Sequence, residues 1–195
     1  FTDSSLGTPN SWRWNFGDGT TSTNQNPSHS YATTGNYSVS LIVSNTSGCS
    51  DTITQIVYVN SIPVPDFTND TVCLGNSMNF INLTTNSQPI TTYLWDFGDG
   101  NNSFGNNPSY NYPAAGTYTV TLTVTNNGGC DSSISKQVIV NANPIANFTH
   151  DTVCLGLSTT FNDASSGLPI SWKWNFGDFT PVDSTSGPGV THTYA

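Results

Sequence analysis

Four aspartates stand where carboxylates could hold a metal ion. Three of them end a Phe-Gly-Asp turn that follows a tryptophan: they are Asp18, Asp99 and Asp178, and Asp96 lies close to Asp99. Aspartate oxygens are preferred ligands of Ca²⁺, so these residues are the candidate calcium site, and calcium is the candidate cofactor. An aspartate beside glycine also accepts hydrogen bonds from its own turn, and the sequence favours this structural role.

Four cysteines are the next candidates for chemistry. Cys49 and Cys130 each follow a glycine, and Cys73 and Cys154 each open a Cys-Leu-Gly sequence. A zinc site needs clustered ligands, whereas these cysteines are spread singly along the chain. An even number of cysteines in a chain of extracellular character favours disulfides instead.

The chain contains no recognisable catalytic constellation. Serine and threonine are abundant, but no His-Asp partner recurs with them, and phosphate loops, His-Glu-x-x-His and paired glutamates are absent from the sequence. His29 and His192 occupy a position at which the second copy of the pattern has Tyr110. A position that accepts tyrosine indicates packing, so we expect no enzymatic activity.

Composition favours strands and excludes two classes of partner. Only 8% of the residues are charged, glutamate is absent, and Thr, Ser, Asn, Val and aromatic residues are common, which is typical of strands joined by turns. The net charge of −9 with three Lys and Arg argues against nucleic acid and anionic membrane surfaces. Apolar runs are strand-sized, so we expect no membrane insertion.

A repeat of about 80 residues, a size that can enclose one small core, defines the architecture. "GNYSVSLIVSNTSGC" returns as "GTYTVTLTVTNNGGC", "DTVCLG" occurs twice, and "WNFGD" follows the pattern of "WDFGD". Within the repeat, apolar and polar residues alternate, for example at Tyr118, Val120, Leu122 and Val124 between threonines. Alternation predicts strands with one buried face, as in antiparallel sheets.

Tryptophan and tyrosine side chains are the predicted core. Each tryptophan shares a strand face with a second aromatic residue, and the five predicted core residues are Trp14, Trp95, Trp174, Tyr37 and Tyr118. An exposed tryptophan stripe could instead stack on sugars, but its alternation with polar residues favours burial. The pattern predicts an all-β fold of tandem immunoglobulin-like β-sandwiches, each of about seven strands, arranged end to end.

The combined motif "WNFGDG…NPSHSY…TGNYSVSLIVSN" resembles the PKD domain, a β-sandwich first named from polycystins. The resemblance extends over the whole chain and is greatest for tandem repeats of giant surface adhesins of Bacteroidetes. It implies an extracellular spacer or adhesive module without catalysis. The third copy departs from the pattern at Phe179, which stands where the other copies have glycine.

Alignment of the copies predicts three repeats. Residues 1–60 form a repeat that lacks its first strand or strands, 61–141 a complete repeat, and 142–195 a repeat that lacks its last two strands. We expect the chain to be a window cut from a longer array. The alternative is that neighbouring copies in a filament supply the missing strands by strand addition.

The predicted sandwich restricts cysteine pairing. Cys49 and Cys73 are separated by extended chain, and Cys73 and Cys130 should lie at opposite ends of one sandwich, beyond the reach of a disulfide. We therefore expect each Cys-Leu-Gly cysteine to bond to the Gly-Cys cysteine of the next repeat. The partners of Cys49, Cys73, Cys130 and Cys154 would then all lie outside this chain.

Three Asp-Thr sequences are candidates for modification. Thr52, Thr71 and Thr152 lie in "DTI" or "DTV", which is similar to the acceptor pattern for O-glycosylation in Bacteroidetes. The alternative is the ordinary composition of strand edges.

These observations predict an extracellular structural or adhesive array, a stiff stalk or filament on a bacterial cell surface. Its partners would be neighbouring repeats of the same long chain and, at an adhesive tip, surface glycans or other cells. The alternative is a spacer or accessory module of a secreted enzyme that degrades polysaccharide or protein.

Overall fold

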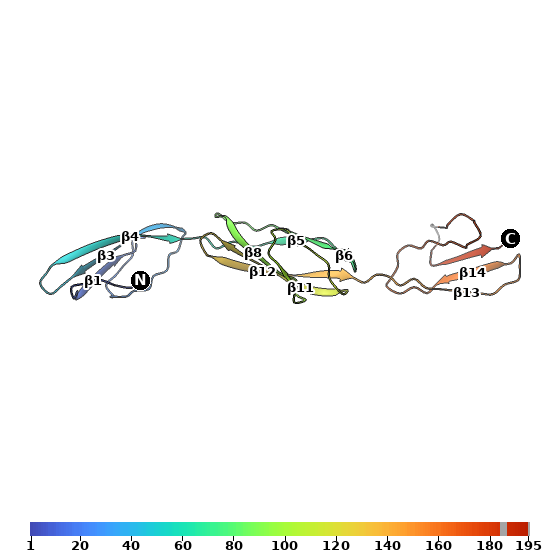
Figure 1. The fold of residues 1–195 in the computed structure, drawn as a ribbon, viewed down its shortest axis with the longest axis horizontal. Helices are drawn as coiled ribbons and strands as arrows, with labels where there is room; N and C mark the ends of the chain where they lie inside the picture. The colour runs from blue at the N-terminus through green and yellow to red at the C-terminus, as the bar shows by residue number, and fades with distance from the viewer. Residues whose placement is uncertain (184–186, 195) are drawn as a thin grey trace.

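The structure is a computed structural model that describes residues 1–183 and 187–194. The regular elements in these ranges are β-strands, and none of the described residues is helical. Figure 1 shows three strand-built units that follow one another along one long axis. The predicted all-β class of tandem immunoglobulin-like units, arranged end to end, is confirmed.

The second unit is a sandwich of two sheets. One sheet has the strand order β6-β12-β11-β8-β9, and the other has the order β10-β7-β5. Neighbouring strands are antiparallel except β6 and β12, which are parallel. The strands are β5 (Phe67–Asn69), β6 (Val72–Cys73), β7 (Met78–Asn82), β8 (Ile90–Asp96), β9 (Asn102–Ser103), β10 (Ser109–Tyr110), β11 (Gly116–Asn126) and β12 (Asp131–Asn141).

Alternation along the strands builds the core of this unit. The buried apolar residues of β11 are Val120, Leu122 and Val124, and they alternate with threonines that retain contact with solvent. Trp95 of β8 is fully buried, and its ring lies 5.1 Å from that of Phe67 and 5.5 Å from that of Phe80, centroid to centroid. Burial of a large apolar side chain contributes about 2–3 kcal/mol, so Trp95 stabilises the contact between the two sheets.

A lysine links the two sheets at one side of the same sandwich. Lys136 of β12 extends its ammonium to within 2.6 Å of Asp66 Oδ1, just before β5, and lies 5.1 Å from the ring centroid of Phe67. This contact bridges the two sheets and lowers the pKa of the Asp66 carboxyl, first through the hydrogen bond from Lys136.

The first unit is built on one sheet of order β2-β1-β3-β4. Its strands are β1 (Ser11–Asn15), β2 (Thr21–Ser22), β3 (Gly35–Ser44) and β4 (Ser50–Val59). Trp14 and Phe16 are buried, and the Phe1 ring packs against both, at centroid distances of 5.6 and 5.2 Å. A cleft of about 570 Å³ lies over this sheet, between the segment that begins at Phe1 and strands β3 and β4.

The third unit contains β13 (Phe148–His150), β14 (Ser158–Asp163) and β15 (Gly189–Thr193) in the order β13-β14-β15. The alternation around Trp174 predicts a strand, but this prediction was wrong, because the segment forms only an isolated bridge between Trp174 and Asp183. In the second unit, the equivalent strand β8 is held by antiparallel pairing along β11. The described residues of the third unit include no such partner strand.

Candidate functional site

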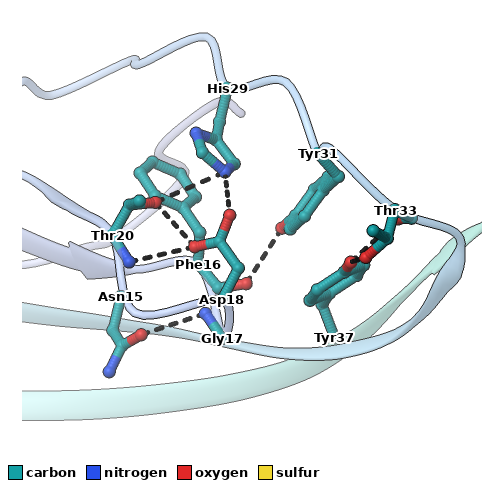
Figure 2. A network of polar contacts seen from close by, with 9 residues as sticks. All are labelled: Asn15, Phe16, Gly17, Asp18, Thr20, His29, Tyr31, Thr33 and Tyr37. Carbon is teal, nitrogen blue, oxygen red and sulfur yellow. Dashed lines mark hydrogen bonds and ion pairs between the residues drawn. The ribbon is translucent and has the colours of Figure 1, made fainter.

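The Phe-Gly-Asp turn of the first unit is a closed hydrogen-bond network (Figure 2). Asp18 Oδ1 accepts hydrogen bonds from the Thr20 backbone N–H at 3.0 Å and from the Thr20 hydroxyl at 2.6 Å. Asp18 Oδ2 lies 2.7 Å from His29 Nε2. The Thr20 hydroxyl, more than any other group, lowers the pKa of Asp18 to about 2.

The same network recurs in the other two units. Asp178 accepts hydrogen bonds from Thr180 and lies 2.7 Å from His192 Nε2, and its pKa is likewise lowered to about 2, first by the Thr180 hydroxyl. In the second unit, the Tyr110 hydroxyl donates to Asp99 Oδ2 at 2.8 Å. Histidine and tyrosine are therefore interchangeable at this position, because the side chain of each reaches the aspartate carboxylate of its own unit.

The histidine or tyrosine ring also stacks on the phenylalanine of the turn. His29 lies 4.2 Å from Phe16 and His192 lies 4.1 Å from Phe176, centroid to centroid, with nearly parallel rings. Tyr110 lies on Phe97 in the same way, at 4.0 Å. The sequence predicted packing for these positions, but it did not predict the bond to aspartate. The available signal was the fixed position of the ring two residues before another tyrosine.

The tyrosine two residues after the stacked ring anchors the segment that carries both side chains to the Phe-Gly-Asp turn. The Tyr31, Tyr112 and Tyr194 hydroxyls donate to the carbonyl oxygens of the turn phenylalanines at 3.0, 3.1 and 3.2 Å. One bond of this kind thus holds the turn against the tyrosine segment in each unit. A tyrosine corner of the immunoglobulin kind, with the hydroxyl bonded to the backbone a few residues upstream, is formed by other residues: Tyr37 and Tyr118 donate to the Thr33 and Ala114 carbonyl oxygens at 2.8 Å.

In the first two units the glycine inside the turn is required by space as well as by backbone conformation. A Cβ at Gly98 would lie 2.4 Å from the Thr119 carbonyl oxygen, and one at Gly17 would lie 2.8 Å from that of Ser38. Both glycines have positive φ, 78° and 83°. The glycine after the aspartate differs, because Phe179 takes its place in the third unit with φ 64°, and nothing crowds that position in the second unit at Gly100.

The aspartates are placed as structural acceptors. Asp96 accepts the Gly98 N–H at 2.9 Å, and Asp99 accepts the Asn101 N–H at 3.1 Å. Among residues 1–183 and 187–194, no group of three or more His, Cys, Asp or Glu side chains could hold a metal ion. Calcium binding at Asp18, Asp96, Asp99 and Asp178 stays a prediction. In the structure these carboxylates accept hydrogen bonds from their own turns.

The predicted core residues lie on or beside the core. Trp14 and Trp95 are buried, and their indole N–H groups donate to the carbonyl oxygens of Asn24 and Gly105 at 3.1 and 2.9 Å. Tyr37, Tyr118 and Trp174 are half-buried. The buried tryptophans therefore present no flat face to a sugar.

The first junction between units is held by polar side chains. Asn126, which is buried, donates from Nδ2 to the Ser61 carbonyl at 2.7 Å, and its Oδ1 accepts N–H groups of the β11–β12 turn. Asn60 donates to the Gly128 carbonyl at 3.2 Å and accepts from Gln88 Nε2 at 2.8 Å. These bonds fix the turn of the second unit against the chain that leaves the first.

The candidate modification sites are accessible. Thr52, Thr71 and Thr152 are exposed, which a glycosylation acceptor requires.

The four cysteines are free thiols. Cys49, Cys73 and Cys154 are exposed, and Cys130 is half-buried. No helix in the described part of the chain has the length and apolar character to cross a membrane.

Comparisons with known proteins agree with this architecture. A family model described as PKD domain matches the chain three times, over residues 1–61, 60–140 and 141–195. The pre-pro-metalloprotease PrtV of Vibrio cholerae serotype O1 is 40% identical over 91 residues, which are 44% of this chain and 10% of that protein. Collagenase ColA of Bacillus cereus is 51% identical over 55 residues, 28% of this chain and 6% of that protein.

The chain thus covers no more than 10% of the length of these two relatives. Among solved structures, the PKD1 domain of Vibrio anguillarum Epp is 34% identical, with a TM-score of 0.41 over 43% of this chain and 99% of that one.

Proposed function

The chain belongs to the PKD domain family, and from this premise we propose that it is a non-catalytic spacer of an extracellular bacterial protein. A spacer must keep two other parts of a protein at a distance from each other. The observation that carries the proposal is the linear order of three units, with a hydrogen-bonded junction between the first two (Figure 1). Such a chain lengthens a protein and adds few flexible joints to it.

The setting that the relatives support best is an accessory segment of a degradative enzyme. Two relatives carry the names metalloprotease and collagenase, and the chain is similar to only a small part of each. A PKD segment that aligns with a tenth of a protease leaves room for the catalytic domain elsewhere. In this setting the present chain would position a catalytic domain relative to other modules.

The second candidate is a stalk or filament on a bacterial cell surface. The repetition of one unit with equivalent turns favours it, because an array is lengthened simply by adding units. In that setting neighbouring repeats are the partners, and glycans or other cells are the targets of a tip. The coding sequence on either side separates the candidates: a protease or polysaccharidase domain supports the first, and a long series of further units supports the second.

A co-sedimentation assay tests the spacer function. The full chain is mixed with collagen fibres or with insoluble polysaccharide, and the pellet and supernatant are compared. We expect the chain to remain in the supernatant, because Trp14 and Trp95 are buried in the units, and to leave casein and gelatin uncleaved, because its sequence shows no catalytic constellation. Saturable retention on either solid would assign a substrate-binding module instead, and cleavage would assign an enzyme.

Two lesser proposals have direct measurements. If calcium binds the aspartate turns, the melting temperature rises with added Ca²⁺ and falls with a chelator. Because the carboxylates are occupied by hydrogen bonds, we expect no change in the melting temperature.

If Thr52, Thr71 and Thr152 carry O-glycans, the intact mass measured on protein from the native host exceeds the sequence mass by whole sugar units.

A further inference from the structure

We propose that successive units are joined by a disulfide, between the Cys-Leu-Gly cysteine of one unit and the Gly-Cys cysteine of the next. The inference goes beyond the spacer function and does not depend on it. It rests on where the structure places Cys73 and Cys130 relative to two equivalent asparagines at the ends of units.

Cys73 lies at the outgoing end of the second unit. It belongs to β6, which runs parallel to the end of β12, and its Cα partner is Asn141, the last residue of that strand. The next residue, Leu74, donates its N–H to the Asn141 carbonyl at 2.8 Å. The Asn143 side chain donates to the Leu74 carbonyl at 2.9 Å. The Cys-Leu-Gly turn is therefore held against the chain that leads into the third unit.

Cys130 lies at the incoming end of the same unit. Its Sγ is 4.0 Å from the Asn60 carbonyl oxygen, in the chain that arrives from the first unit. The Asn60 side chain donates to the Gly128 carbonyl, and a Cβ at Gly128 would lie 2.4 Å from that side chain. The Gly-Cys turn is thus pressed against the residue that ends the preceding unit.

Asn60 and Asn141 are equivalent residues, because each directly follows the valine that ends the paired part of its hairpin. Each junction of this chain shows one contact to this residue, and both contacts are made to its carbonyl oxygen, at Asn141 in the second junction and at Asn60 in the first. The upstream unit brings the residue after its Cys-Leu-Gly cysteine to 2.8 Å, and the downstream unit brings its Gly-Cys sulfur to 4.0 Å. A junction with both turns would therefore bring the two cysteines close to each other, as a disulfide requires.

Pairing inside one unit is excluded by distance. Strand β12 runs from Asp131, next to Cys130, to Asn141, beside Cys73. Eleven residues of strand span about 35 Å, whereas disulfide-bonded Cα atoms lie within about 7 Å. Each of the two junctions in this chain contains one of the two cysteines: the first contains Cys130 and the second contains Cys73.

The chemistry is an oxidation by an external disulfide. One thiolate attacks a sulfur of a low-molecular-weight disulfide and releases one thiolate of it. The second thiolate then attacks the mixed disulfide, forms the S–S bond between the units and releases the other. Two protons leave the protein thiols, and the external disulfide receives two electrons. The exposure of Cys73 makes it accessible to such a reagent.

The test completes the second junction with the chain's own sequence. A second copy of residues 114–141 is appended after Ala195, so that the third unit gains the hairpin that contains Cys130 in the second unit. Cys49, Cys154 and the original Cys130 are changed to Ser, which leaves Cys73 and the appended cysteine. The matched control carries Cys73→Ser in addition.

After incubation with oxidised glutathione, we expect nearly complete loss of free thiol in the monomer and one cross-linked peptide that contains Cys73. The control should form no cross-linked peptide, and its single cysteine should remain a free thiol or a mixed disulfide with glutathione. Because the appended hairpin could fail to pair, a second version carries residues 33–60 in its place, and sheet content is measured by circular dichroism. Two cysteines that stay unlinked, as free thiols or as separate glutathione adducts, in a version whose added strands are formed would overturn the proposal, as would a Cys73–Cys130 bond in the unaltered chain.

Discussion

At the scale of residues, each Phe-Gly-Asp turn is stabilised by groups that face inward to the turn itself. The carboxylate of Asp18 is shared between Thr20 and His29, and Tyr31 binds the carbonyl oxygen of Phe16 (Figure 2). Gly17 permits the approach of the neighbouring strand. The residues that recur between units are those that close this network, which explains their repetition without any catalytic role.

The two glycines of the second turn should differ in their tolerance of alanine. Gly98→Ala forces a Cβ against the Thr119 carbonyl in addition to its positive φ, so we expect a loss of about 2–4 kcal/mol in the stability of the second unit. Gly100→Ala meets only the backbone cost, about 1 kcal/mol. Hydrogen exchange of the β11 amides measures both. Equal losses would contradict the close approach.

The acidity of Asp18 should depend more on threonine than on histidine. Thr20→Val removes the hydroxyl that does most to lower the Asp18 pKa to about 2, so we expect the pKa to rise toward 3.8, and to rise further than in His29→Phe. Because the folded-state pKa is lowered, the stability from the ionised carboxylate is present above about pH 4 and is lost as pH falls toward 2. A carboxyl-carbon NMR titration measures the pKa, and an unchanged value in Thr20→Val would refute this assignment.

The sequence predicted the structural role of the aspartates because an Asx turn is local. It could not predict the bond from His29 to Asp18, because that contact depends on how two separate segments fold onto each other. The bonds of Tyr31, Tyr112 and Tyr194 to the turn could be inferred more readily, because the spacing of these tyrosines recurs in all three copies. The left-handed backbone at Phe179 could be inferred only from the glycines at the equivalent positions.

At the scale of elements, a strand exists here where it has a partner. The same alternating pattern forms β8 against β11 in the second unit but only an isolated bridge at Trp174 in the third. Periodicity therefore predicted which face of a segment is apolar, and it could not predict whether the ladder of hydrogen bonds is complete. The junction between the first two units was also unpredictable, because it depends on the side-chain bonds of Asn60 and Asn126.

The junction should soften when its glycine is replaced. An alanine Cβ at Gly128 would displace the Asn60 side chain and break its bonds to Gly128 and Gln88, while the sandwich itself stays folded. We expect ¹⁵N relaxation to show more independent tumbling of the first two units in Gly128→Ala. The matched control is Gly129→Ala, whose Cβ would meet open space and which carries only the backbone cost of its positive φ, 77°. Relaxation rates equal to those of the parent chain would show that the asparagine bonds do not restrain the junction.

At the scale of the whole molecule, three small cores replace one large core. The buried aromatic and aliphatic clusters of the first and second units are separate, and the third has its own contacts among Phe148, Phe161 and Trp174. A chain built in this way gains length with each unit, whereas a compact domain of equal size gains volume. Length is the property that a spacer uses.

Small-angle X-ray scattering of the full chain tests this central claim most directly. The longest strands of the second unit span about 37 Å, so three units of that length in line give a maximum dimension of about 110 Å and a radius of gyration of about 30 Å. A compact globule of 195 residues would have a radius of gyration of about 16 Å. We predict the extended values at every protein concentration, and a radius near that of the globule would contradict the account.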